Sequence, residues 1–471
     1  MKGKIVLGVV ISLILINGIL GKGGEKPFLH KEEIEDFLTS LGIDEITIST
    51  LNISDIYLSD IPDDFWSWMN VSKEEGAKIV KDMINKIINN ELGALEKFIE
   101  LFSPEVETER PILTFGPETL EEVKSDPWVI AVYGEIPEFD TQEERWEWID
   151  KLHKINEKER IEKFLEEYDY PNGPICMTGA DERKGCFDIG IWEEYELDEN
   201  LLNEIYLKID AIATSLGIKN VPVIFAKASP LIFDVEIINE TPLSETKINA
   251  FQPGRGRNDT YRPIIGGIQV TNYIQQTRIT STLGWPAKRG NTKGYVVSGH
   301  LGPNNLTPLN IPIYQPDRPD EAGRVERRGG NYSDAAFVNF SNVAPLIYTV
   351  PYGSRRGIVT GYWSPNVGAQ VYMSGIASGW TTGEVAYTGW RVVSSDRVLY
   401  NQTLATYLHQ QGDSGAPVLS WGRELIPGVA FVTVYGIHGG ATIWNYRIYA
   451  VFSPVSGVYT DMGVTPLTIR G

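Results

Sequence analysis

The chain has 471 residues and a formal net charge of −20. Its charge is divided unevenly: residues 1–250 hold 24 Lys plus Arg against 51 Asp plus Glu, whereas residues 251–471 hold 18 against 11. Because the basic half has no lysine- or arginine-rich helix, the composition argues against a nucleic-acid partner. Halves of opposite charge instead predict that the acidic half binds the basic one.

The first 22 residues have the pattern of a secretory signal peptide. Lys2 and Lys4 precede an apolar run over residues 5–20, and small residues follow it. We therefore expect an exported, extracellular protein. The alternative is an uncleaved anchor, in which residues 5–20 tether the protein to the cell surface; only then would a membrane be a partner.

Residues 23–250 are predicted to form an acidic α+β domain. Capping-box patterns at Ser72 and Thr141 predict helices over about 72–95 and from 141 to about 168. A strand, a helix and a strand are predicted over 187–192, 201–216 and 221–225, with Gly217 ending the helix.

Cys176 and Cys186 are the only cysteines of the chain. In an oxidising compartment this spacing predicts a local disulfide. Because no histidine neighbours the pair, a zinc site is not expected, and the sequence calls for no metal or other cofactor.

Residues 251–263 form a polar, turn-rich stretch that predicts a linker open to cleavage. With the charge division and the exported start, this predicts a precursor whose N-terminal domain is an intramolecular chaperone and inhibitor, removed by a cut within 249–263. The alternative is an accessory binding domain that stays attached.

Residues 264–471 are predicted to be all-β. Short runs rich in Val, Ile, Tyr and Thr, such as 370–373, 391–393 and 429–435, are separated by clusters of Gly, Pro, Asn and Ser. This pattern is typical of a sandwich or barrel, and two small barrels would leave a cleft between them for residues on strand-end loops.

Three residues in this half have the chemistry of a nucleophile, a base and an orienting acid. Ser414 lies in the turn 412–415, Gly-Asp-Ser-Gly, whose glycines would let the N–H groups of Gly412 and Ser414 converge as an oxyanion hole. His300 follows an apolar strand, and Asp334 enters another. The order His, Asp, Ser is one in which nucleophilic serine catalysis recurs.

Several segments resemble chymotrypsin-fold serine peptidases, nearest to the secreted bacterial branch of streptogrisins and α-lytic protease. They are residues 264–267, 297–300, 374–385 and 452–455, around the turn at Ser414. The resemblance covers the C-terminal half and implies a double six-stranded barrel, catalytic His300, Asp334 and Ser414, and protein or peptide substrates.

The sequence departs from this branch in two places. The branch usually has an arginine where Ile376 stands, which holds the aspartate before the nucleophile, so Asp413 needs another partner. The candidates are a new α-amino group at Ile264 or Ile265 released by processing, or another arginine. The disulfides of the branch are also missing from residues 251–471.

The resemblance places the pocket for the residue before the cut between two stretches of chain, 408–411 and 436–440. The candidate pocket residues are Leu408, His409, Gln411, His438, Gly439 and Gly440. The stretch at His438 resembles the Gly-Ile-His motif of glutamyl endopeptidases, which predicts a preference for Glu or Asp. An alternative alignment puts His438 where the family has a main-chain substrate-binding serine, and a preference for apolar residues stays open.

Together these features predict a secreted serine endopeptidase, a hydrolase made as a zymogen and acting through an acyl-enzyme. The alternative is a catalytically silent relative that is a binding or adhesion module. Retention of His300, Asp334 and Ser414 favours the enzyme, since a silent relative is free to lose any of them.

Overall fold

The computed structural model describes residues 110–234, 236–239, 256–274, 277–302, 305–349, 356–426 and 429–469. The predicted signal peptide at 1–22, the predicted helix at 72–95 and the first part of the linker, 251–255, lie outside these residues. In the described part of the chain, no helix is long and apolar enough to cross a membrane.

The N-terminal region packs helices against a small sheet, which confirms the predicted α+β class for its described residues. Its elements are α7 (Thr119–Val123), β1 (Val129–Tyr133), α8 (Gln142–Ile155), α9 (Lys158–Leu165), β2 (Ile175–Asp181), β3 (Cys186–Trp192), α10 (Glu199–Ser215) and β4 (Val223–Ala228). The strands lie in the order β1-β4-β3-β2, with β3 and β4 parallel. The predicted strand, helix and strand correspond to β3, α10 and β4.

The single helix predicted from 141 to about 168 is wrong, although its start is right. Thr141 forms the expected capping box with Glu144, but α8 ends at Ile155 and α9 begins at Lys158. The break is stabilised by Asn156, whose buried side-chain amide donates to the carbonyls of Thr178 and Gly389. These tertiary hydrogen bonds compensate for ending the helix early.

The predicted disulfide is also wrong, because both cysteines are free and buried. Cys176 lies near the start of β2, whereas Cys186 starts β3 and pairs across the hairpin with Asp181. The hairpin therefore separates the cysteines by about five residues of extended strand, roughly 16 Å, far beyond disulfide reach. The Cys186 thiol instead donates to Asp188.

In its described residues the C-terminal region is all-β apart from α11 (Val455–Met462), which confirms the predicted fold class, and strands from residues 232–239 join its sheets. Nine strands form one sheet in the order β23-β10-β11-β14-β13-β12-β8-β9-β6. Their bounds are β23 (Thr465–Pro466), β10 (Pro286–Arg289), β11 (Thr292–Ser298), β14 (Ala335–Asn339), β13 (Glu321–Arg328), β12 (Pro312–Tyr314), β8 (Gln269–Ile274), β9 (Thr277–Thr282) and β6 (Glu236–Asn239).

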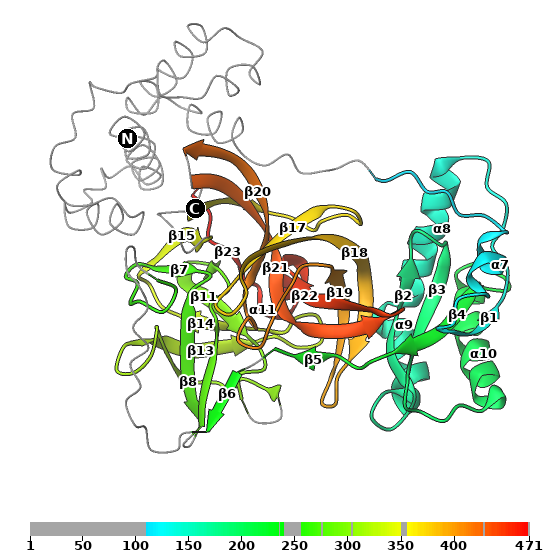
Figure 1. Ribbon diagram of the computed structural model, residues 1–471, viewed down its shortest axis with the longest axis horizontal. Coiled ribbons are helices and arrows are strands. Elements are labelled where there is room, and N and C mark those ends of the chain that lie inside the picture. The colour runs from blue at the N-terminus through cyan, green and yellow to red at the C-terminus, as the bar shows by residue number, and fades with distance from the viewer. Residues whose placement is uncertain are drawn as a thin grey trace, which may run out of the picture.

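The remaining strands of this region belong to a second, 14-stranded sheet. They are β5 (Ile232–Phe233), β7 (Ile264–Gly266), β15 (Val343–Tyr348), β16 (Arg356–Tyr362), β17 (Gln370–Gly375), β18 (Gly379–Val393), β19 (Val398–Ala405), β20 (Pro417–Ile426), β21 (Val429–Trp444) and β22 (Arg447–Pro454). The same sheet includes β1 to β4, so it joins the N-terminal region to the C-terminal one (Figure 1).

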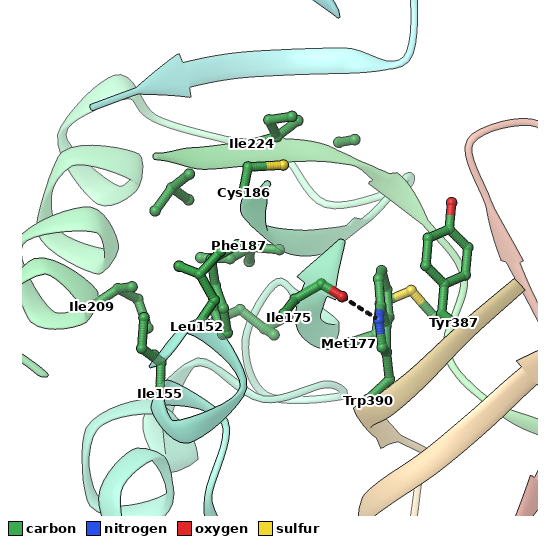
Figure 2. Packing of buried hydrophobic residues seen from close by; sticks show 14 of the residues in the cluster. Leu152, Ile155, Ile175, Met177, Cys186, Phe187, Ile209, Ile224, Tyr387 and Trp390 are labelled. Carbon is green, nitrogen blue, oxygen red and sulfur yellow. Dashed lines mark hydrogen bonds between the residues drawn. The ribbon is translucent and has the colours of Figure 1, made fainter. Parts of the chain in front are cut away.

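The junction between the two regions is a continuous, buried piece of sheet. Strand β2 pairs antiparallel with β18 through Arg391↔Thr178 and Val392↔Met177. Figure 2 shows Trp390 and Tyr387 of β18 beside Met177, and the buried Trp390 indole donates to the carbonyl of Ala180. Buried Arg391 also forms an ion pair with Asp169. Buried side chains of the N-terminal and C-terminal regions thus form one continuous hydrophobic core.

Gly179 is a position at which this junction leaves no room for a larger side chain. A Cβ there would lie 2.5 Å from atoms of the Trp390 indole. We expect Gly179→Ala to lower the free energy of unfolding by about 1–3 kcal/mol, the usual cost of overpacking a core. Urea unfolding measures it. Gly361→Ala is the matched control, because no atom lies within 4 Å of its new Cβ; equal effects of the two changes would contradict the packing argument.

Candidate active site

His300, Asp334 and Ser414 meet in the interior of the C-terminal region. The Nδ1 atom of His300 lies 2.5 Å from Asp334 Oδ2, and its Nε2 atom lies 2.7 Å from Ser414 Oγ. At most 1% of each residue is exposed. An imidazole held in this way between a carboxylate and a hydroxyl can accept the serine proton and stabilise the resulting charge.

The two sheets bring these residues together from distant parts of the chain. Strands β11 and β14 pair through Ser298↔Ala335, which brings His300, just after β11, close to Asp334, just before β14. Ser414 lies in the turn before β20, in the other sheet. The apolar strands recognised in the sequence therefore set the separation of the imidazole and the carboxylate.

Asp334 has a second charged partner that the sequence did not reveal. Arg397, in the turn between β18 and β19, donates from its guanidinium to Asp334 Oδ1. Burial alone would raise the pKa of Asp334, but the charges of His300 and Arg397, together with their hydrogen bonds, lower this pKa to about 2. The carboxylate therefore stays ionised while fully buried.

Two backbone amides converge where the sequence predicted an oxyanion hole. The N–H groups of Gly412 and Ser414 both donate to the carbonyl oxygen of Asp234, with N···O distances of 2.8 and 3.3 Å. Gly412 has φ 99°, a left-handed conformation that side chains disfavour, which explains the glycine at this position.

The partner of Asp413 is the polypeptide backbone. Among the described residues, its carboxylate accepts hydrogen bonds from the N–H groups of Ala377, Ser378 and Gln410 at 2.9–3.2 Å. In the uncut chain Ile264, which with Ile265 is a predicted source of a new α-amino group, lies buried in β7 and donates its N–H to the carbonyl of Asn342. Several oriented amides can therefore stabilise this buried charge without an arginine.

The short segment 231–234 lies across these groups as an extended strand. Strand β5 pairs antiparallel with β21 through Phe233↔Gly440 and Ile232↔Ala441. The N–H of Asp234 donates to the carbonyl of Gly439 at 3.2 Å. The carbonyl of Gly439, next to His438, is therefore a main-chain acceptor for this segment.

Two of the candidate pocket residues bind the side chain of Asp234. His409 Nδ1 contacts Asp234 Oδ2, and His438 Nε2 lies 3.0 Å from the same oxygen. The Tyr407 hydroxyl, which the sequence analysis missed, lies 3.0 Å from His438 Nδ1. Of the other candidates, Gly439 and Gly440 contact the backbone of the segment, whereas Leu408 and Gln411 are solvent-exposed.

The two histidines favour the ionised form of the Asp234 carboxylate. Burial would raise the pKa of Asp234, but hydrogen bonds from His409 and His438 lower it well below its usual range. The three side chains are also the one group in the described residues with the geometry for a metal ion, since their ligand atoms lie within 4.8 Å of one another. His409 and His438 contact Asp234 directly, so the carboxylate oxygen that would bind a metal ion already has hydrogen-bond partners.

No protein-family model matches the chain. Among solved structures, it is similar to Thermobifida fusca protease A, with 22% identity, a TM-score of 0.35, and coverage of 44% of this chain and 98% of that one. It is also similar to Cellulomonas bogoriensis chymotrypsin, with 20% identity, a TM-score of 0.34, and coverage of 43% of this chain and 98% of that one. A third similar structure is a glutamic acid specific serine protease, described as using a novel histidine triad in substrate binding. The identity is 21%, the TM-score is 0.35, and the match covers 43% of this chain and 100% of that one.

The ion pairs of Asp334 predict a pH dependence of stability. Its pKa is about 2 in the folded protein and near 3.8 ordinarily. Its contribution, about 2 kcal/mol, should be fully present above about pH 4 and lost as the pH falls towards 2. Urea midpoints measured across this range should fall less steeply for Asp334→Asn. The control is Asp150→Asn, at a half-exposed ion pair; identical slopes for Asp334→Asn and the wild type would contradict the argument.

Proposed function

We propose that the chain is a serine endopeptidase whose nucleophile is Ser414. The observation that carries the proposal is the distance of 2.7 Å between His300 Nε2 and Ser414 Oγ, with Asp334 on the other imidazole nitrogen. The amides of Gly412 and Ser414, which converge on one carbonyl oxygen, support the same conclusion. This arrangement suits acyl transfer, in which negative charge develops on the carbonyl oxygen.

Each group has one role in the reaction. Ser414 attacks the scissile carbonyl carbon while His300 takes the hydroxyl proton and then gives it to the leaving amine. Asp334, held ionised by Arg397, orients the imidazole and stabilises its charged form. The two amides bind the oxyanion, and water then hydrolyses the acyl-enzyme by the same steps. Protein or peptide chains are the expected substrates.

We also propose a preference for an acidic residue before the cut. The support comes from His409 and His438, which both meet the carboxylate of Asp234. The Tyr407 hydroxyl on the far nitrogen of His438 fixes the orientation of that ring. A carboxylate entering this pocket finds two donors, whereas a lysine or an apolar side chain would give His409 Nδ1 and His438 Nε2 no acceptor.

Export and synthesis as a precursor belong to the same proposal. The basic and apolar start of the sequence supports export, and the opposite charges of the two halves support an N-terminal region that binds the peptidase in the precursor. A silent binding module would not require an imidazole held between a buried carboxylate and a serine, so the enzyme is the better explanation.

Replacement of the nucleophile tests the proposal. Ser414→Ala should lower casein hydrolysis by about ten-thousand-fold or more and abolish labelling by a fluorophosphonate, because it removes the proposed nucleophile that forms the acyl-enzyme. The control is Ser456→Ala, at an exposed position of α11. Casein hydrolysis that persists in purified Ser414→Ala would exclude this mechanism.

A set of peptides that differ only in the residue before the cut tests the preference. Asp and Glu peptides should be cleaved with a kcat/KM about 100-fold higher than the Asn peptide, because a neutral amide oxygen is a weaker acceptor for the two histidines than a charged carboxylate oxygen. The variant His438→Gln should reduce this ratio more than it reduces labelling by a fluorophosphonate. Equal or better cleavage after Phe would exclude the acidic preference.

A further inference from the structure

Residues 231–234 bind to the proposed active site in the manner of a substrate. We propose that this segment is the first substrate of the enzyme, and that the peptidase cuts its own chain between Asp234 and Val235 within the same molecule. The inference rests on the proposed function and adds the bond, the direction of cleavage and the reason why the uncut chain is inhibited.

The backbone of the segment supplies the first argument. An extended peptide that adds to a sheet is a common mode of peptide recognition, and β5 does this on β21. The Leu231 N–H also donates to Val393, at 2.8 Å. A Cβ at Gly440 would collide with the carbonyl oxygen of Ile232, so this glycine makes room for the pairing.

The carbonyl of Asp234 supplies the second argument. Of the carbonyls in the segment, it is the one that accepts from both Gly412 and Ser414, the two donors of the proposed oxyanion hole. Its peptide bond is the one that leads to Val235. The segment therefore runs in the direction that presents this bond to Ser414, with the acidic side chain of Asp234 in the pocket of His409 and His438.

The side chain of Phe233 supplies the third argument. Its ring stacks on the imidazole of His300, with centroids 4.3 Å apart and planes inclined by 26°. The guanidinium carbon of Arg397 lies 5.0 Å from the same ring. Phe233 thus covers the base and the residue that holds Asp334. Another peptide could reach His300 only after this ring is displaced, so the uncut chain inhibits itself.

The course of the chain around the bond explains why a cut here is tolerated. Before it, β5 belongs to the 14-stranded sheet; after it, β6 pairs with β9 at the edge of the nine-stranded sheet. The chain therefore crosses between the sheets at this point (Figure 1). Because β2 pairs with β18, and Asp169 with Arg391, the two pieces should remain bound after cleavage.

The proposed cut consumes one water molecule and needs no other reactant. Ser414 Oγ bonds to the carbonyl carbon of Asp234, the bond to the Val235 nitrogen breaks, and His300 transfers the serine proton to that nitrogen. Water then releases Asp234 as a new carboxyl terminus and regenerates the serine. The cut lies ahead of the segment 249–263 in which the sequence alone predicted processing.

A metal site is the competing explanation of the contacts between Asp234 and the two histidines. It would account for the carboxylate, but not for the carbonyl in the oxyanion hole or for the ring of Phe233 on His300. The two explanations differ in one measurable respect, since cleavage by Ser414 needs no metal ion.

The test is to purify the full chain and to determine its termini by intact mass and N-terminal sequencing. The wild type should yield a piece that ends at Asp234 and a piece that begins at Val235, which elute together in native chromatography. Ser414→Ala should remain one chain. The rate of the cut should not change with protein concentration, and a chelator should have no effect.

Variants of the segment separate this inference from the proposed function. Asp234→Asn should slow the cut at least tenfold and Asp234→Glu should retain it, whereas Asp140→Asn, at an exposed position, should have no effect. Circular dichroism checks that each variant folds. A Ser414-dependent cut at another bond, a cut that requires a second molecule, or one that requires zinc would overturn the inference and leave the peptidase in place. Casein hydrolysis and a cut that both persist in Ser414→Ala would overturn the proposed function itself.

Discussion

The buried carboxylate of Asp334 is the constraint on which the rest of the site depends. A carboxylate with 1% of its surface exposed is stable in its ionised form only if opposite charges and hydrogen bonds replace the water it has lost. His300 and Arg397 provide these on separate oxygens, and Ser453 Oγ accepts from the Asp334 N–H. The imidazole is thereby fixed with its second nitrogen towards Ser414.

Arg397 links this constraint to the segment 231–234. The same guanidinium that compensates Asp334 lies near the ring of Phe233, which in turn stacks on His300. Phe233 is therefore in contact with both groups that keep the buried carboxylate ionised. An aromatic residue at this place in a peptide stabilises the arrangement, because it shields the pair of charges from water.

The part of the site that could be predicted from the sequence is the part carried by local patterns. His300 and Asp334 each adjoin an apolar strand, and Ser414 lies in a glycine turn, so chain order and strand ends were enough to group them. Arg397 and Tyr407 could not be found, because neither lies in a pattern of its own and each reaches its partner only through the pairing of distant strands. Asp413 differs from these residues. The sequence suggested a charged partner for it, but its partners are backbone amides, which every residue except proline carries and which no sequence pattern marks.

The N-terminal region illustrates the same limit at the level of the fold. The capping box at Thr141 gave the start of α8, but the end of this helix depends on contacts of Asn156 with residues in β2 and β18, which are far apart in the sequence. The cysteine pair suggested a disulfide because sequence spacing carries no information on strand register. The strand register keeps the two thiols apart. The end of α8 and the positions of the cysteines are therefore both set by tertiary contacts rather than by local propensity.

Buried polar contacts connect the acidic half of the chain to the basic half. The ion pair between Asp169 and Arg391 is almost fully buried at the junction, and Asp234 meets two histidines in the pocket. Pairs of this kind specify one arrangement, because a shift of a single strand residue would leave a buried charge without a partner. The acidic region is therefore held in register, and this register brings the carbonyl of Asp234, rather than that of a neighbouring residue, to the amides of Gly412 and Ser414.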